Sequence, residues 1–258
     1  MLEVKHLTVR SKEGRPLVRD VSFTLTPGEP LGLTGASGSG KTTIIKAVMG
    51  ILPYGCVIEA GEILLDGLSL EKLPARERRK YCGTVLGFIP QSPMTAFDPH
   101  MRIGAQMVQT FRLRLNLPKD KALTLAREQL LAVNLEDVER ILNSFPSQLS
   151  GGMLQRLMIA AALMCQPSLL VADEATTAID ACNRIGLMRE LKSFCKEGMS
   201  VLFVTHDLRS ASVSDCILVM DRGQIVEQDT TERILNAPKE DYTKYLLNAC
   251  RLERRKMP

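Results

Sequence analysis

Residues 30–50 read PLGLTGASGSGKTTIIKAVMG, and this stretch decides the fold. Its first part, PLGLTG, is a short apolar run that predicts a buried strand running into glycines. Residues 41–49 predict a helix that ends at Gly50. Between them, residues 35–42 read GASGSGKT and fit the pattern GxxxxGK[ST]. A strand, a glycine-rich loop and a helix in this order indicate an α/β core.

The glycine-rich loop, called the P-loop below, has the features of a phosphate-binding site. Glycines let the backbone curl so that its N–H groups face phosphate oxygens, and the helix N-terminus adds positive potential. Lys41 can reach the β- and γ-phosphates, and the Thr42 hydroxyl can bind Mg²⁺. The alternative is a glycine-rich turn without a ligand, which the strand and helix on either side disfavour.

A second stretch, LLVADE at residues 169–174, supplies the acidic partner that such a loop needs. Four apolar residues of a predicted buried strand end in two carboxylates. Asp173 is expected to bind Mg²⁺, directly or through a coordinated water. Glu174 is expected to orient or deprotonate the attacking water. An acidic pair at a strand end is weak support by itself and becomes strong beside the P-loop.

The rest of the chain alternates between strands and helices. Residues 2–9 and 18–25 predict two early strands with a turn around Gly14, and SLLVADE, SVLFVTH and DCILVMD predict buried strands of a parallel sheet. From about residue 100 to 165 the periodicity is helical. Two faces carry this prediction: Ile103, Met107, Val108 and Phe111, and Leu123, Ala126 and Leu130.

Composition narrows the function classes. The chain has 258 residues with a net charge of +4, and its last eight residues, with four basic and one acidic, supply +3 and leave +1 for the body. A nearly neutral body disfavours a nucleic-acid partner. Seven cysteines with no CxxC pair favour a reducing cytosol. The longest apolar run, at residues 157–165, is far too short to span a membrane, and residues 1–10 have no signal-peptide core.

Further motifs carry a resemblance to a known family. Residues 149–156, LSGGMLQR, resemble the signature of ABC ATPases and precede the acidic pair as they do in that family. FIPQ at 88–91 is similar to the Q-loop, TAID at 177–180 to the D-loop, and VTHD at 204–207 to the switch-histidine segment. Together with the P-loop and the acidic pair, these segments make six motifs in the order of the family, and the resemblance covers nearly the whole chain.

The resemblance implies a fold and an organisation. The fold is a P-loop NTPase (RecA-like) core with an N-terminal antiparallel β subdomain and a helical subdomain specific to ABC proteins. It implies one domain over residues 1–258, in which 1–91 and 166–258 form the nucleotide-binding core. The helical subdomain with the signature then occupies about 92–165.

The resemblance also implies residue roles, with ATP and Mg²⁺ as cofactors. The triphosphate is expected to lie against Gly35, Ala36, Ser37, Gly38, Ser39, Gly40, Lys41, Thr42 and Thr43. Thr42, Gln91 and Asp173 serve Mg²⁺ directly or through water. Glu174 is the catalytic base, His206 contacts the γ-phosphate and helps to hold the attacking water, and Gln91 is the third catalytic residue. Ser150, Gly151 and Gly152 bind ATP held on the opposite protomer, and Asp180 links the two sites.

Finer features resemble the oligopeptide/nickel branch of importers. They are PQSPMTAFDP, GGMLQR, DEATTAID and APKEDYTKYLL, and GILPYG with AGEILLDG is similar to nickel or metal-chelate import ATP-binding subunits of the D type. The implied partners are a second ABC ATPase subunit, two membrane permeases and an extracytoplasmic substrate-binding protein, with no nucleic acid. The implied location is the cytoplasmic face of the cell membrane. An oligopeptide importer ATPase and a soluble ABC ATPase of iron–sulfur cluster assembly are the alternatives.

Two positions depart from the family pattern. The family usually has proline after the catalytic glutamate, whereas this chain has Ala175. The family often stacks an early aromatic under adenine, and this chain has no aromatic before Phe23. Stacking of Arg10 or Arg15 on the base is one alternative, and hydrophobic contacts alone are the other. Discrimination between ATP and GTP is therefore expected to be weak.

Overall fold

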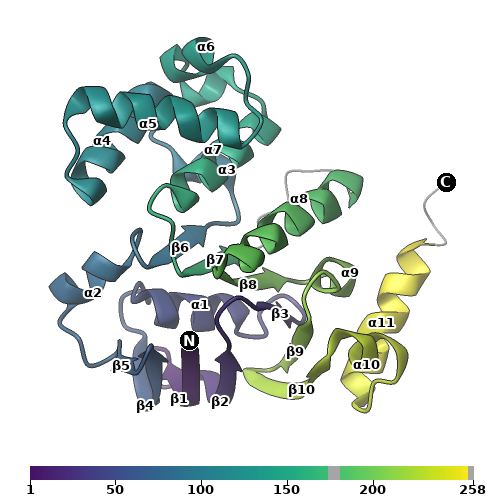
Figure 1. Ribbon diagram of the computed structural model, residues 1–258. Helices are drawn as coiled ribbons and strands as arrows, with labels where there is room; N and C mark the ends of the chain where they lie inside the picture. The colour runs from purple at the N-terminus through teal and green to yellow at the C-terminus, as the bar shows by residue number, and fades with distance from the viewer. Residues whose placement is uncertain (174–180, 255–258) are drawn as a thin grey trace.

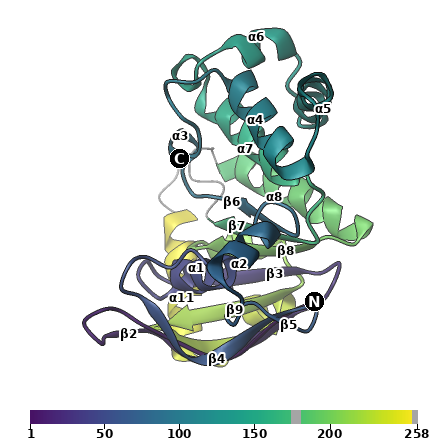
Figure 2. The same ribbon diagram turned by 90° about the vertical axis from the view of Figure 1, so that its left-hand side faces the viewer.

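The computed structural model describes residues 1–173 and 181–254, and it has three layers. Figures 1 and 2 show an antiparallel sheet at one end, a mainly parallel sheet in the middle and a group of helices at the other end. The α/β fold with an antiparallel N-terminal sheet and a helical part is therefore confirmed. The division of one domain at about residues 92 and 165 stays a prediction. No described helix is long and apolar enough to cross a membrane.

The antiparallel sheet has the strand order β2-β1-β4-β5. Its strands are β1 (Leu2–Arg10), β2 (Pro16–Leu25), β4 (Val57–Leu65) and β5 (Leu68–Ser69). Along β1, Leu2, Val4, Leu7 and Val9 are buried, and the alternation shifts by one residue between Val4 and Leu7. A bulge causes this shift: the pairing register slips there, and His6 has a φ of 51°.

The second sheet has the order β10-β9-β3-β8-β7-β6, in which only the β9–β10 pair is antiparallel. Its strands are β3 (Pro30–Thr34), β6 (Leu86–Ile89), β7 (Leu169–Asp173), β8 (Ser200–Thr205), β9 (Cys216–Asp221) and β10 (Gln224–Thr230). All residues of β3, β7 and β8 are buried, as their unbroken apolar runs predict. Because the four parallel neighbours β3, β8, β7 and β6 end on one edge, the loops that follow them meet there.

Helix α1 (Lys41–Met49) begins and ends where the sequence predicts and lies between the two sheets (Figure 1). Ile44, Ile45 and Val48 are fully buried in a core that includes residues of both sheets. At its end Gly50 is left-handed, with φ of 70°, and its N–H donates to Ala47 and Lys46 carbonyls. The helix that follows the P-loop is therefore fixed on two sides by hydrophobic packing.

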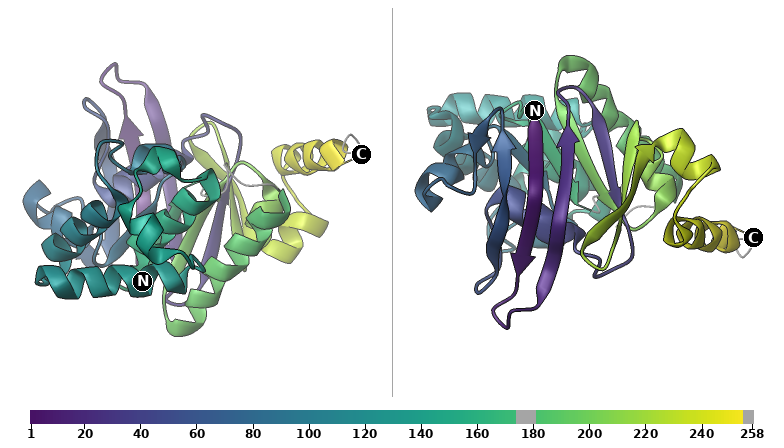
Figure 3. Two further views of the ribbon diagram at one scale, coloured as in Figure 1. Left: turned by 90° about the horizontal axis from the view of Figure 1, so that it is seen from above. Right: turned by 90° about the horizontal axis from the view of Figure 1, so that it is seen from below.

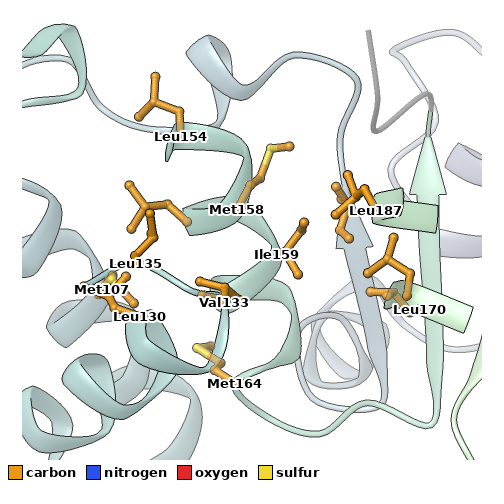
Figure 4. Packing of buried hydrophobic residues seen from close by; sticks show 14 of the residues in the cluster. Met107, Leu130, Val133, Leu135, Leu154, Met158, Ile159, Met164, Leu170 and Leu187 are labelled. Atoms are coloured by element: carbon orange, nitrogen blue, oxygen red, sulfur yellow. The ribbon is translucent and has the colours of Figure 1, made fainter. Parts of the chain in front are cut away.

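The helical part fills the connection between β6 and β7. Its elements are α3 (Pro93–Ala96), α4 (Ile103–Leu115), α5 (Lys119–Ala132), α6 (Val138–Asn143), the 3-10 helix η1 (Pro146–Gln148) and α7 (Gly151–Leu163). Figure 4 shows Leu154, Met158 and Ile159 of α7 between these helices and the residues Leu170 and Leu187. The predicted faces are confirmed, although Val108 and Leu123 are half-buried at the edge of the cluster.

The helices that follow β7 in the chain pack on or beside the second sheet. They are α8 (Ala181–Ser193), the 3-10 helix η2 (Phe194–Glu197), α9 (Leu208–Ala211), α10 (Thr231–Asn236) and α11 (Asp241–Arg254). Figure 3 shows α11 on the outside of the molecule beside α10. A third hydrophobic cluster, which includes Leu208, Ile217, Ile234 and Leu247, joins α9, β9, α10 and α11.

A neighbouring helix, α2 (Ala75–Tyr81), caps the end of α1. The Arg78 guanidinium donates hydrogen bonds to the carbonyls of Ala47 and Val48, and the Cys82 thiol donates to Met49 O at 3.1 Å. Burial raises the pKa of the Cys82 thiol against the lowering effect of Arg78, so the thiol stays protonated and able to donate. A Cβ at residue 50 would lie 2.3 Å from Arg78 Nε, so glycine at this position makes room for the guanidinium.

We predict that Arg78→Ala lowers the free energy of unfolding by about 1–3 kcal/mol, because it removes the donor to two helix-end carbonyls. Arg76→Ala is the matched control, since Arg76 is exposed on the same helix. Urea denaturation of both variants measures the difference. Equal stability of the two variants would contradict this role of Arg78.

Candidate functional site

The carboxyl edge of the parallel strands brings the predicted site residues together. The P-loop follows β3, Gln91 follows β6, Asp173 is the last residue of β7, and His206 follows β8 directly. These four strands are neighbours in the sheet. Segments separated by up to 171 positions in the sequence, from Gly35 to His206, therefore meet at one edge.

The P-loop passes very close to two other backbone segments. A Cβ at Gly35, where φ is 149°, would lie 2.1 Å from the carbonyl oxygen of Met220 in β9. A Cβ at Gly40, where φ is 108°, would lie 2.8 Å from the carbonyl oxygen of Leu17 in β2. Both positions thus need glycine for conformation and for space.

Lys41 is 5% exposed, and its ammonium group turns back over the loop. Nζ donates hydrogen bonds to the carbonyl oxygens of Gly35 at 2.7 Å and Ala36 at 2.9 Å. These neutral carbonyls hold the charge at the centre of the loop. Anionic phosphate oxygens are stronger partners for the same ammonium group.

A cavity of about 620 Å³ opens beside the loop, a size in the range of small-molecule sites. Its lining residues are Arg15, Pro16, Leu17, Arg19, Ser37, Gly38, Gly40, Lys41, Thr42, Thr43, Gln91, Arg222 and Gly223. Four of them are cationic and none is acidic, in the part of the chain that the structure describes. The charge of the cavity fits a polyanion such as a nucleoside triphosphate.

The turn between β9 and β10 forms one wall of this cavity, and no motif in the sequence predicted it. Gly223 N–H donates to Ser39 O at 2.9 Å, and Arg19 N–H donates to Gly223 O at 2.8 Å. These bonds bring Arg19 and Arg222 to the rim of the P-loop. No sequence signal links positions so far apart, because only the sheet pairing places this turn under the loop.

The two candidates for base stacking differ in position. Arg15 lines the cavity. Arg10 does not, because its guanidinium bonds to the Glu59 carboxylate at 2.5 Å and to Gly14 O at 2.9 Å. Of the two arginines, only Arg15 is placed to stack on a base, and this role stays a prediction.

The oxygen donors expected for Mg²⁺ are a hydroxyl, an amide and a carboxylate. Thr42 and Gln91 line the cavity, and Asp173 is 6% exposed at the end of β7. One carboxylate with neutral oxygen donors suits Mg²⁺, which keeps several waters and binds phosphates as well. The donor chemistry therefore fits this ion.

The signature residues lie elsewhere in the chain. Ser150 is the N-cap of α7 and its Oγ accepts the Met153 N–H at 3.3 Å, while Gly151 and Gly152 are exposed. A Cβ at Gly152 would meet nothing within 4 Å. None of the three lines the cavity. Glu174 and Asp180 lie outside the described residues, so their roles, like those of the other site residues, stay predictions.

Comparison with protein families gives one match over most of the chain. Residues 18–177 match the family described as ABC transporter. The metal-staphylopine import system ATP-binding protein CntD of Staphylococcus aureus (strain Mu50 / ATCC 700699) is 40% identical over 251 residues, which are 96% of this chain and 92% of that protein. The glutathione import ATP-binding protein GsiA of Escherichia coli (strain K12) is 39% identical over 240 residues, which are 90% of this chain and 38% of that protein.

Solved structures agree on the fold. An ATP-binding cassette, MJ0796, in a dimeric post-hydrolysis state bound to ADP and Pi, has a TM-score of 0.80 and 26% identity. The match covers 90% of this chain and 99% of that one. Another dimeric structure of the same bacterial cassette has a TM-score of 0.79 and 27% identity, with the same coverage.

The contact between Gly35 and Met220 generates a stability prediction. Gly35→Ala should lower the free energy of unfolding by about 2–5 kcal/mol, because the new Cβ forces the loop away from β9 and strains the backbone. Gly38→Ala is the matched control: φ is 81° but a Cβ meets nothing within 4 Å, so its cost should stay at about 1–2 kcal/mol. Chemical denaturation of both variants measures the gap, and a larger cost for Gly38→Ala would contradict the close approach.

Proposed function

The chain belongs to the ABC transporter family of ATPases, and we propose that it is the motor subunit of an importer whose cargo is a nickel or cobalt chelate. One observation supports the motor most strongly. The P-loop, Gln91, Asp173 and His206 lie at the ends of four neighbouring strands on one edge of the sheet, and the P-loop and Gln91 line a cationic cavity. Glycine-rich turns without a ligand need no such arrangement.

The cargo proposal rests on resemblance. A metal-chelate importer subunit, CntD, is 40% identical over nearly the whole chain. The GILPYG, GGMLQR and C-terminal segments point in the same direction. Short peptides are the second candidate cargo, because the glutathione importer protein is 39% identical. That the metal is nickel or cobalt is a finer proposal, which rests on the resemblance of sequence segments alone.

The site would perform hydrolysis by positioning and by charge. The P-loop at residues 35–43 surrounds the triphosphate, which the N–H groups of residues 38–43 and the Lys41 ammonium bind. Thr42, Gln91 and Asp173 would hold Mg²⁺, which supplies neutralising charge at the phosphate oxygens. The Glu174 carboxylate accepts a proton from the attacking water, and His206 holds that water at the γ-phosphate.

Each active site would need two ATPase chains. Ser150, Gly151 and Gly152 do not line the cavity of their own chain, so we propose that they close over ATP bound to a partner subunit. The dimeric cassettes of similar fold support this arrangement. Asp180 would link the two sites. Closure of the pair at the cytoplasmic face of the membrane can then do work on two permease subunits. An extracytoplasmic binding protein would deliver the cargo to these permeases, and no nucleic acid is involved.

The base assignment predicts that Glu174→Gln lowers the turnover of the assembled complex by about 10²–10⁴-fold. Binding of Mg-ATP should persist, because the amide keeps the shape of the side chain and only proton acceptance is lost. Glu197→Gln is the control, since Glu197 is exposed on the surface. Phosphate release and nucleotide affinity are both measured. Hydrolysis near the wild-type rate in Glu174→Gln would make the base assignment wrong.

The cargo proposal predicts the outcome of uptake assays in cells that carry Lys41→Ala. Accumulation of radioactive nickel supplied with a chelator should fall to background, while uptake of a labelled short peptide is unchanged. Exposed Lys196→Ala serves as the control. If only peptide uptake falls, the cargo proposal fails and the motor proposal survives. If neither falls, both fail.

A further inference from the structure

The C-terminal helix α11 reaches the P-loop through one side chain. The Tyr242 hydroxyl oxygen accepts a hydrogen bond from the Ala36 N–H at 3.0 Å, across 206 positions of sequence. The carbonyl of the same peptide unit, Gly35 O, accepts the Lys41 Nζ at 2.7 Å. One peptide plane is thus bonded at both of its polar ends, to Tyr242 on one side and to Lys41 on the other.

Contacts outside the P-loop hold the first turn of α11 in place. The Glu227 carboxylate in β10 accepts the N–H groups of Lys239 at 2.8 Å and Glu240 at 3.2 Å. Burial raises the pKa of Glu227, but the two backbone donors, together with the Thr243 hydroxyl and the Lys239 charge, outweigh burial and lower this pKa. The carboxylate is therefore ionised at neutral pH and stabilises the N-terminal end of the helix. One of its two donors, Glu240, is two positions before Tyr242 in the chain.

The other end of α11 is fixed beside the switch-histidine segment. The Arg209 guanidinium donates to the carbonyl of Cys250, and the Cys250 thiol lies 3.8 Å from the Asp207 carboxylate. Asp207 follows His206 and is the N-cap of α9. Between the two ends, Leu247 is 9% exposed in the third hydrophobic cluster. The helix is held by the fold at three places that do not involve the P-loop.

We propose that Tyr242 is a positioning residue for nucleotide binding, and that it holds the Gly35–Ala36 peptide in the orientation that places Lys41 over the phosphate site. This inference rests on the proposed function, since it assumes that the P-loop binds a nucleoside triphosphate. The hydrogen bond to Ala36 N–H polarises the peptide and makes Gly35 O a better acceptor for the Lys41 ammonium. Without the hydroxyl the peptide can rotate, so part of the population has a loop that is not competent to bind.

The test uses the full chain and calorimetric titration with Mg-ATP. Tyr242→Phe keeps the ring and removes the hydroxyl, so the Kd should rise about three- to tenfold, as expected for one hydrogen bond. Tyr245→Phe is the matched control, because Tyr245 is on the same helix and 67% exposed, and its Kd should equal that of the wild type.

A second measurement separates positioning from simple packing. Amide hydrogen exchange at Ala36 without nucleotide should be faster in Tyr242→Phe than in Tyr245→Phe, at an equal melting temperature. An unchanged Kd overturns the proposal. So does a lower melting temperature with unchanged exchange at Ala36, because Tyr242 would then only pack.

A third variant tells failure of this inference from failure of the proposed function. Lys41→Ala removes the ammonium group itself and should abolish detectable Mg-ATP binding. If Lys41→Ala binds as the wild type does, the proposed nucleotide site fails and the role of Tyr242 fails with it. If Lys41→Ala loses binding while Tyr242→Phe keeps it, only the role of Tyr242 fails.

Discussion

The contact between the P-loop and β9 is the constraint on which the site depends. Residue 35 has no room for a side chain, because a Cβ would lie 2.1 Å from the carbonyl oxygen of Met220. The neighbouring strand β9 therefore constrains the shape of the loop. The hydrogen bonds from Gly223 N–H to Ser39 O and from the Lys41 ammonium to two carbonyls also hold the loop in this shape. A preorganised loop loses little entropy on binding.

The rest of the fold supports this loop from outside. Helix α1 begins at Lys41 and lies between two sheets, with its far end capped by Arg78 and Cys82. The helical part packs on the other face of the second sheet through α7, which carries the signature at its N-terminus. One chain thus holds a phosphate-binding half and a signature half that do not meet. Under the proposed function, this division would make hydrolysis conditional on a partner subunit.

Local sequence patterns predicted much of this structure. The P-loop and α1 follow from residues 35–50, because glycine, lysine and apolar spacing act within one turn of chain. The neighbouring positions of Gln91, Asp173 and His206 follow from parallel strands with a common edge. Arg19, Arg222 and Tyr242 could not be predicted, since their positions depend on sheet pairing and on the docking of α11. The bulge at His6 was missed, although the three-residue spacing from Val4 to Leu7 breaks the alternation of apolar residues in the sequence.

The most direct test of the account is a crystal structure of the chain with Mg²⁺ and a non-hydrolysable ATP analogue. The account predicts the triphosphate against the N–H groups of residues 38–43, with the base toward Arg15. Lys41 Nζ should contact phosphate oxygens and keep its hydrogen bond to Gly35 O, while the backbone of residues 35–40 keeps its present shape. An analogue bound elsewhere, or a P-loop that refolds around the phosphates, would contradict a site that is shaped before its ligand arrives.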